Sequence, residues 1–143
     1  MRVPTTAELP EIAVLLSESG LPTGDLSDQD LSLFRIAGPT ERLDGVGGLE
    51  RYGDAALLRS VATATSLRGR GIAGAIVGEL ERLAGNEGVR SLYLLTESAE
   101  RFFESRGYTT IERSDVPAAI RGARQFSSLC PDSATVMCKR VGG

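Results

Sequence analysis

Histidine is absent from this chain of 143 residues. Its absence removes the usual general base, the serine–histidine–aspartate triad and the ligands of most catalytic metal sites. The two cysteines, Cys130 and Cys138, lack C-x-x-C spacing, so neither a metal site nor a disulfide framework is expected. Any acid–base chemistry must therefore use carboxylates, tyrosine, cysteine, hydroxyl groups, the backbone or water.

The sequence also lacks a basic block and a long apolar run. The net charge is −3, so nucleic acid is not an expected partner. No window reaches the length of a membrane span, which argues against a membrane protein. Met1–Pro4 opens the chain without a signal-peptide apolar region, and this predicts a cytoplasmic protein. The length predicts one domain with one core, residues 1–143.

Apolar periodicity and turn signals predict a chain of interleaved strands and helices. Ser91–Leu95 is nearly all apolar, as in a central parallel strand that is buried on both faces. The order of these elements places antiparallel strands first and one parallel crossover in the middle of the chain. This order predicts a mixed α/β sheet flanked by helices. The expected elements are a helix from the Thr5–Glu8 capping box to Gly20, then Leu31–Ile36 (strand), Val46–Tyr52 (strand), Ala55–Ala62 (strand), Ile72–Ala84 (helix), Ser91–Leu95 (strand), Ser98–Gly107 (helix), Tyr108–Arg113 (strand), Pro117–Gln125 (helix) and Ala134–Val141 (strand).

The most informative stretch is Arg68–Gly74, which connects an apolar strand to a strongly helical run. Glycines let the backbone approach a ligand closely. The first amides of the following helix have no intrahelical acceptor, and the helix dipole makes that end positive. Arg68 and Arg70 can add charge-assisted hydrogen bonds. The stretch predicts a phosphate or pyrophosphate site; the alternative is a glycine-rich loop with solvated arginines.

The spacing Gly69-x-Gly71-x-x-Gly74 also fits the dinucleotide-binding fingerprint, and Glu97 stands near the distance expected for its ribose-binding acid. Three features of the context disfavour that interpretation. Residues 63–68 separate the strand from the first glycine, more than sixty residues precede the motif, and too few follow Glu97 to complete a doubly wound sheet.

Arg68-x-x-Gly71-x-Ala73 resembles the Arg/Gln-x-x-Gly-x-Gly/Ala pattern of the GNAT acyltransferases, and Val61–Thr65 stands where that family has a Val-x-Val-x-Pro strand end. The resemblance extends in element order along nearly the whole chain. It implies the GNAT (acyl-CoA N-acyltransferase) fold, with splayed central parallel strands, and acetyl-CoA as the acetyl-donor cosubstrate. The implied cofactor-binding residues are Val61, Ala62, Thr63 and Thr96 on the pantetheine arm, Arg68, Gly69, Arg70, Gly71, Ile72, Ala73 and Gly74 at the pyrophosphate, and Phe103 near the thiol.

One position departs from the family pattern A-x-x-F-Y-x-x-x-G-F. Phe103 stands where the family often has a tyrosine that protonates the coenzyme A thiolate, and phenylalanine cannot donate a proton. The donor is then water, Ser98, Ser127, Ser128 or Cys130, or the thiolate leaves unassisted.

Three residues are candidates for the catalytic chemistry: Glu50, Glu97 and Cys130. Glu50 is the first choice for the general base, with a cross-strand ion pair as the alternative. Glu97 is a further candidate for the base, because it follows a buried strand at the end where ligand clefts open in such sheets. The alternative is a carboxylate that only stabilises a helix N-terminus. Cys130 is a soft ligand, a proton donor or a buried small residue.

The expected acceptor-binding residues lie on two neighbouring strands and in a C-terminal loop. Alternation places Glu50 with Tyr52 on one face of their strand, and Arg59 with Val61 on one face of the next. Arg59 interrupts an apolar run, so we expect it to pair with Glu50 and to anchor a substrate anion. Ser127 and Ser128, in the polar loop before the last strand, are expected to line the acceptor pocket.

A narrower resemblance is to the GNAT proteins of arsenic-resistance operons. It rests on Gly48–Asp54, Leu57–Ala62, Tyr93–Glu97 and Phe126–Pro131 with Ser133-Ala134. It implies an N-acetyltransferase that acts by direct attack on a small amine, such as an amino-bearing arsenical or an amino-acid-like toxin. The alternative is a non-catalytic acyl-CoA-binding sensor. A homodimer is a further expectation by analogy with the fold.

Overall fold

The computed structural model describes residues 1–39, 41–124, 126 and 133–142. Within them a six-stranded sheet runs in the order β1-β2-β3-β4-β6-β5. Its strands are β1 (Phe34–Ala37), β2 (Gly45–Tyr52), β3 (Ala55–Thr63), β4 (Ser91–Thr96), β5 (Thr109–Thr110) and β6 (Thr135–Arg140). Its helices are α1 (Leu9–Glu18), α2 (Ile72–Asn86), α3 (Glu100–Ser105) and α4 (Ala118–Arg121).

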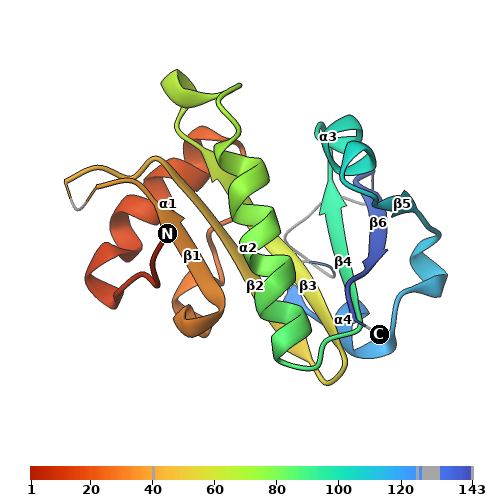
Figure 1. The fold of residues 1–143 in the computed structure, drawn as a ribbon. Helices are drawn as coiled ribbons and strands as arrows, with labels where there is room; N and C mark the ends of the chain where they lie inside the picture. Colours follow the sequence, from red (N-terminus) through yellow and green to blue (C-terminus); the bar gives the residue numbers. More distant parts are fainter. Residues whose placement is uncertain (40, 125, 127–132, 143) are drawn as a thin grey trace.

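The sheet is mixed, as the sequence predicts. Only β3 and β4 pair in parallel, and the other described pairs are antiparallel. The helices cover both faces of this sheet, with α2 lying across β1, β2 and β3 (Figure 1). The mixed α/β sheet is therefore confirmed, and a doubly wound parallel sheet for a dinucleotide is excluded.

Alternation along the central strands divides the apolar side chains between the two faces. On one face, side chains such as Ala56, Leu58 and Leu92 pack against Ile76 and Leu80 of α2. On the other face, Ala55 and Leu57 pack with α4, and further along the sheet Val46 and Ala62 pack with α1. Both faces of β3 are thus buried, which explains its nearly continuous apolar sequence.

The first helix begins as its sequence signal predicts. The Glu8 carboxylate accepts a hydrogen bond of 3.0 Å from the Thr5 amide and is bound by both Nη atoms of Arg2 at 2.8 Å. These contacts satisfy an orphan donor at the helix start and hold the N-terminal residues against it. Arg2 in turn forms an isolated antiparallel bridge with Ile36.

Three predicted boundaries were wrong. Leu31–Leu33 is a 3₁₀ turn rather than the start of a strand, because the Asp30 carboxylate accepts a hydrogen bond of 3.0 Å from the Ser32 amide and caps the turn. The strand expected over Tyr108–Arg113 is paired only at Thr109–Thr110, after which Arg113–Asp115 forms another 3₁₀ turn. Of the helix expected over Pro117–Gln125, α4 covers Ala118–Arg121, and Gln125 lies outside the described residues.

Two adjacent glycines in β2 permit close packing on both faces of the sheet. A Cβ at Gly47 would lie 2.6 Å from Ile76 of α2, and a Cβ at Gly48 would lie 2.5 Å from the ring of Phe34. The sequence predicts a bend or a close approach at this pair, and the close approach is confirmed.

We predict that Gly48→Ala destabilises the fold by about 1–3 kcal/mol, since the buried Phe34 ring must shift to admit a methyl group. Chemical unfolding measures the change. The matched control is Gly85→Ala inside α2, where the nearest atom to the new Cβ would be 3.5 Å away. This control should be neutral or stabilising by up to about 1 kcal/mol. Equal stability of Gly48→Ala and wild type would contradict the packing at this position.

Candidate active site

A pocket opens where β3 and β4 separate. Their parallel pairing covers only Ala55–Leu57 against Ser91–Tyr93, and beyond it each strand stays paired to its other neighbour. Figure 1 shows the two strands close at one end and apart at the other. The gap holds a pocket of about 430 Å³, lined by the turn after α1, by both strands, by the first turn of α2 and by α3.

The Arg68–Gly74 stretch forms one end of this pocket. A 3₁₀ turn at Thr65–Leu67 follows β3, and Gly71 is the N-cap residue of α2. Gly69 and Gly71 have φ values of +82° and +80°, and a Cβ at either would meet nothing within 4 Å. Glycine is therefore needed there for backbone conformation rather than for space. The loop leaves the first amides of α2 without intrahelical acceptors at the positive end of the helix dipole.

Of the predicted cofactor-binding residues, seven line the pocket: Val61, Ala62, Thr63, Arg68, Ala73, Thr96 and Phe103. The others, Gly69, Arg70, Gly71, Ile72 and Gly74, form the connection and the first turn of α2 beside Arg68 and Ala73. Arg68 and Arg70 are exposed, as a site for a ligand from solvent requires. The structure thus brings the strand end and the glycine loop to one opening.

Thr96 and Phe103 form the wall on the α3 side. The Thr96 hydroxyl accepts a hydrogen bond of 3.0 Å from the Ala99 amide and so caps the turn before α3. Phe103 is only 6% exposed and packs edge-on against Phe102 and Tyr108. The Tyr108 hydroxyl instead donates to Glu81 at 2.9 Å, and burial raises its pKa above the ordinary value. Tyr108 does not line the pocket, so it does not replace the absent family tyrosine.

A buried charge cluster forms the opposite wall. Arg59 is 2% exposed, and its two Nη atoms bind the two carboxylate oxygens of Asp25 at 2.6 Å each. Nη1 also binds Glu50 at 2.8 Å, and Nε donates to the Ser60 hydroxyl at 3.1 Å. The predicted pair of Glu50 and Arg59 is confirmed. Asp25, which is also 2% exposed, is a second partner that the sequence does not reveal.

The cluster shifts the pKa values of its members in opposite directions. Burial alone would raise the pKa of Asp25, but the hydrogen bonds and charge of Arg59 outweigh burial and hold this pKa below its ordinary value. Burial would lower the pKa of Arg59, but its two carboxylates raise it instead. Burial raises the pKa of Tyr52, and so does the hydrogen bond that its hydroxyl donates to Glu50. At neutral pH both ions of the Arg59–Asp25 pair are charged.

The predicted common face for Arg59 and Val61 was wrong. The register of β3 against β2 shifts between Gly48↔Arg59 and Val46↔Ala62, and Ser60 has φ +59°. This bulge inserts a residue, so Val61 turns toward α2 while Arg59 faces the other side. Glu50 and Tyr52 do share a face, as predicted, because their hydroxyl–carboxylate hydrogen bond joins them.

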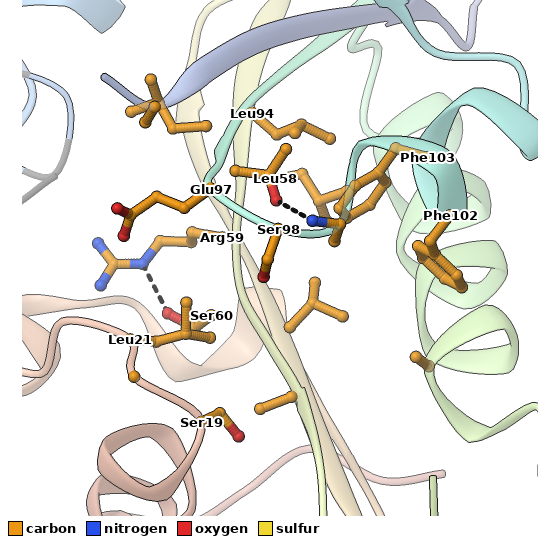
Figure 2. A pocket seen from close by; sticks show the side chains of 18 of the residues that line it. Ser19, Leu21, Leu58, Arg59, Ser60, Leu94, Glu97, Ser98, Phe102 and Phe103 are labelled. Atoms are coloured by element: carbon orange, nitrogen blue, oxygen red, sulfur yellow. Dashed lines mark hydrogen bonds between the residues drawn. The ribbon is translucent and has the colours of Figure 1, made fainter. Parts of the chain in front are cut away.

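The candidate catalytic and acceptor residues fall in three places. Glu97 lines the pocket at the end of β4, and Figure 2 shows its carboxylate on the same side of the pocket as the Arg59 guanidinium. Glu50 does not line this pocket; it reaches Arg59 from β2 and lines a second hollow with Arg51 and Glu87. Tyr52 does not line the pocket either, and its hydroxyl donates a hydrogen bond to the Glu50 carboxylate. Ser127, Ser128 and Cys130 lie outside the described residues.

Several lining residues were missed by the sequence prediction. Ser19, Gly20, Leu21 and Pro22 come from the turn after α1, and Ser60 from the bulge. The Thr63 and Ser19 hydroxyl oxygens are buried without a hydrogen-bond partner among the described residues. Buried polar atoms normally have partners, so unpaired hydroxyls in a pocket wall point to a ligand or water there. The Gly20-Leu21-Pro22 turn marked the end of a helix but gave no signal of its place in space.

An exposed glycine loop at a helix start, joined to a pocket between two separating parallel strands, defines the acyl-CoA-dependent acyltransferase fold. The family model described as "Acetyltransferase (GNAT) domain" matches residues 34–110, which is more than half of the chain. The chain therefore belongs to the GNAT acetyltransferase family. The matched model describes an acetyltransferase domain, so acetyl transfer is the class of activity that the family membership indicates.

Solved structures share the fold at low identity. N-acetylglutamate synthase from Neisseria gonorrhoeae, complexed with coenzyme A and N-acetyl-glutamate, matches with TM-score 0.83, 19% identity and 98% of this chain, which spans only 34% of the synthase. Rv2747 from Mycobacterium tuberculosis, in a complex with CoA, matches with TM-score 0.80 and 23% identity over 97% of each chain. A GNAT acetyltransferase from Staphylococcus aureus matches with TM-score 0.78 and 16% identity, over 98% of this chain and 97% of that one. No curated protein matches the sequence.

The described residues contain no group of three or more His, Cys, Asp or Glu side chains able to hold a metal ion. None of their helices combines the length and the apolar composition that crossing a bilayer requires.

We predict that Asp25→Asn costs about 3 kcal/mol of unfolding free energy, because it leaves part of the buried Arg59 charge uncompensated. The control Asp28→Asn removes an exposed partner of Arg124 and should cost less than about 1 kcal/mol.

The contribution of Asp25 to the free energy of unfolding should also depend on pH, because its folded-state pKa is lowered. This contribution is complete above the unfolded pKa of about 3.9 and is lost as pH falls through the folded value. Urea unfolding at neutral and acid pH measures both effects. Equal costs for the two variants would contradict the buried pair.

Proposed function

We propose that this protein transfers the acetyl group of acetyl-CoA to the primary amine of a small molecule, by direct attack in a ternary complex. The observation that carries this proposal is the single pocket that runs from the Arg68 loop to the carboxylate of Glu97. The loop end suits the phosphates of the coenzyme, and the other end suits an amine. Direct attack requires no residue to carry the acetyl group.

In this proposal the coenzyme lies along the end of β3. Its pyrophosphate binds the amides of Gly69–Gly74, with Arg68 and Arg70 alongside. Its pantetheine arm follows Val61–Thr63, whose edge toward β4 is paired with no strand in the described part of the chain. The unpaired Thr63 hydroxyl lies on this path, and the Thr96 hydroxyl, which accepts from Ala99, still has a proton to donate.

The chemistry needs a neutral amine at about 3–3.5 Å from the thioester carbon. The nitrogen forms a bond to this carbon while the carbon–sulfur bond breaks, and the electron pair leaves on sulfur. A free backbone amide of β3 is the donor for the transient oxyanion. The nitrogen's proton goes to a base and a proton returns to the thiolate. We assign the base to Glu97, which lines the pocket, and place Glu50, which Arg59 and Tyr52 hold, in the charge cluster of the wall.

The identity of the acceptor is the finer part of the proposal. The resemblance to the arsenic-resistance group favours an amino-bearing arsenical or an amino-acid-like toxin. Solved structures of the same fold include a synthase bound to N-acetyl-glutamate and an aminoglycoside 6'-N-acetyltransferase. The fold is therefore compatible both with amines that carry anionic groups and with amines that carry further cationic groups. The acceptor of this protein must be deduced from the walls of its own pocket.

A non-catalytic acyl-CoA sensor is the second candidate. The observation that favours it is Phe103, a buried ring at the position of the proton-donating tyrosine. The two candidates differ in product formation. Acetylated product from any amine in a panel supports the enzyme, whereas tight acetyl-CoA binding with no product from any amine supports the sensor.

We predict that Gly71→Glu abolishes acetyl-CoA binding. The new side chain would strain a left-handed backbone position and would place a negative charge at the phosphate loop. Isothermal titration with acetyl-CoA measures the loss. The matched control is Gly53→Glu in the β2–β3 hairpin, where φ is +67° and the space is equally open. Wild-type affinity in Gly71→Glu, or an equal loss in both variants, would refute the phosphate-loop assignment.

We predict that Glu97→Gln lowers kcat by about 10²–10⁴-fold, since the amide cannot accept the amine proton, and leaves the Kd for acetyl-CoA unchanged. Steady-state kinetics with the best acceptor measures the effect. Glu104→Gln, on the exposed side of α3, is the control for loss of a carboxylate. An unchanged kcat in Glu97→Gln with a large decrease in Glu50→Gln would transfer the base to Glu50.

A further inference from the structure

We infer that the acceptor is an amine that carries a second positive charge and no carboxylate, such as a short aliphatic diamine. This inference rests on the proposed function, because it concerns the acceptor end of the same pocket. It replaces the sequence-based expectation that Arg59 anchors an anion on the substrate.

The first argument is the hydrogen bonding of Arg59. A guanidinium has five N–H groups. Four of them already donate within the protein: two to Asp25, one to Glu50 and one to Ser60. Two parallel N–H groups are needed to bind a substrate carboxylate in the bidentate manner. Arg59 has only one left, so it is a structural cation of the wall rather than a clamp for an anion.

The second argument is the balance of charge at this end of the pocket. The charged side chains among the described lining residues are Arg59, Arg68 and Glu97. Arg68 belongs to the phosphate loop, and the charge of Arg59 is exceeded by its two carboxylates, Asp25 and Glu50. With Glu97, three carboxylates face one guanidinium, which gives a net charge of −2. A carboxylate on the acceptor is repelled there, and an ammonium group is attracted.

The cations around this wall do not reverse the balance. Arg124, whose charge also acts on Asp25, pairs with Asp28 at 3.2 Å. Arg113 lies over the ring of Phe126 and donates to the carbonyl oxygen of Ala134 at 3.4 Å. Both guanidiniums are thus engaged by the protein, and neither Arg113 nor Arg124 lines the pocket.

The third argument is that the acceptor end of the pocket combines a hydroxyl group that can bind a ligand with an apolar wall. Ser19 lines the pocket, and its hydroxyl oxygen is buried without a hydrogen-bond partner among the described residues. Leu21 and Pro22 line the wall contributed by the turn after α1. An alkyl chain suits an apolar wall, and a terminal ammonium suits the carboxylates. A flexible aliphatic diamine combines both properties.

The test uses three conjugates of coenzyme A that need no turnover. In each, the sulfur is joined through an acetyl linker to one nitrogen, which belongs to 1,4-diaminobutane, pentylamine or 5-aminopentanoate. The conjugates share the coenzyme and chain length and differ only in an ammonium, methyl or carboxylate end. Titration calorimetry gives their Kd values. We expect the ammonium end to bind roughly tenfold tighter than the methyl end, and the carboxylate end roughly tenfold weaker.

Equal affinities, or tightest binding of the carboxylate conjugate, would overturn the inference and leave the coenzyme site intact. If none of the conjugates and no acetyl-CoA binds, the proposed function falls, and the inference falls with it. These two failures are distinguishable because unmodified acetyl-CoA is titrated alongside.

A variant separates the charge argument from general damage. Glu50→Gln removes one negative charge while the Arg59–Asp25 pair remains, so the Kd ratio between carboxylate and ammonium conjugates should fall by roughly tenfold. The control Glu79→Gln removes a carboxylate paired with Arg82 on α2 and should leave the ratio unchanged. The same ratio in Glu50→Gln and wild type would contradict the role of this charge cluster.

Discussion

The early end of the parallel pairing between β3 and β4 is the constraint on which the rest of the structure depends. After Leu57 and Tyr93, β3 remains bound to β2 and β4 to β6, so neither strand can close the gap. The gap exposes an unpaired backbone edge inside the molecule, and such an edge requires a hydrogen-bonding partner. The glycine loop and the start of α2 stand at its end, where they can hold the charged part of that partner.

The buried Arg59 cluster fixes the other wall. Asp25 comes from the segment after α1, Glu50 from β2 and Arg59 from the neighbouring strand β3, so a distant segment and a hairpin meet at one guanidinium. The desolvation of these charges is costly, and the geometry of the hydrogen bonds is what offsets it. The result is a rigid wall with excess negative charge, which links the N-terminal third of the chain to the acceptor end of the pocket.

The sequence predicted those features that depend on local pattern. The Arg68–Gly74 loop, the buried strand at β4 and the order of elements were all visible in residue types and spacing, and the pair of Glu50 and Arg59 followed from cross-strand geometry. The bulge at Ser60 was not visible, because serine has no intrinsic preference for φ +59° and is held there by its surroundings. Asp25 and the Ser19–Pro22 turn were missed because their contacts join segments far apart in the sequence.

The most direct test of the central claim is a nitrogen-15 NMR titration of the protein with acetyl-CoA and, separately, with NAD. The account predicts that acetyl-CoA shifts the amide signals of Gly69, Gly71, Ala73 and Gly74, together with those of Val61–Thr63 at the end of β3, and that NAD shifts none of them at the same concentration. Shifts caused equally by NAD, or acetyl-CoA shifts that leave both the loop and the strand end unchanged, would contradict it.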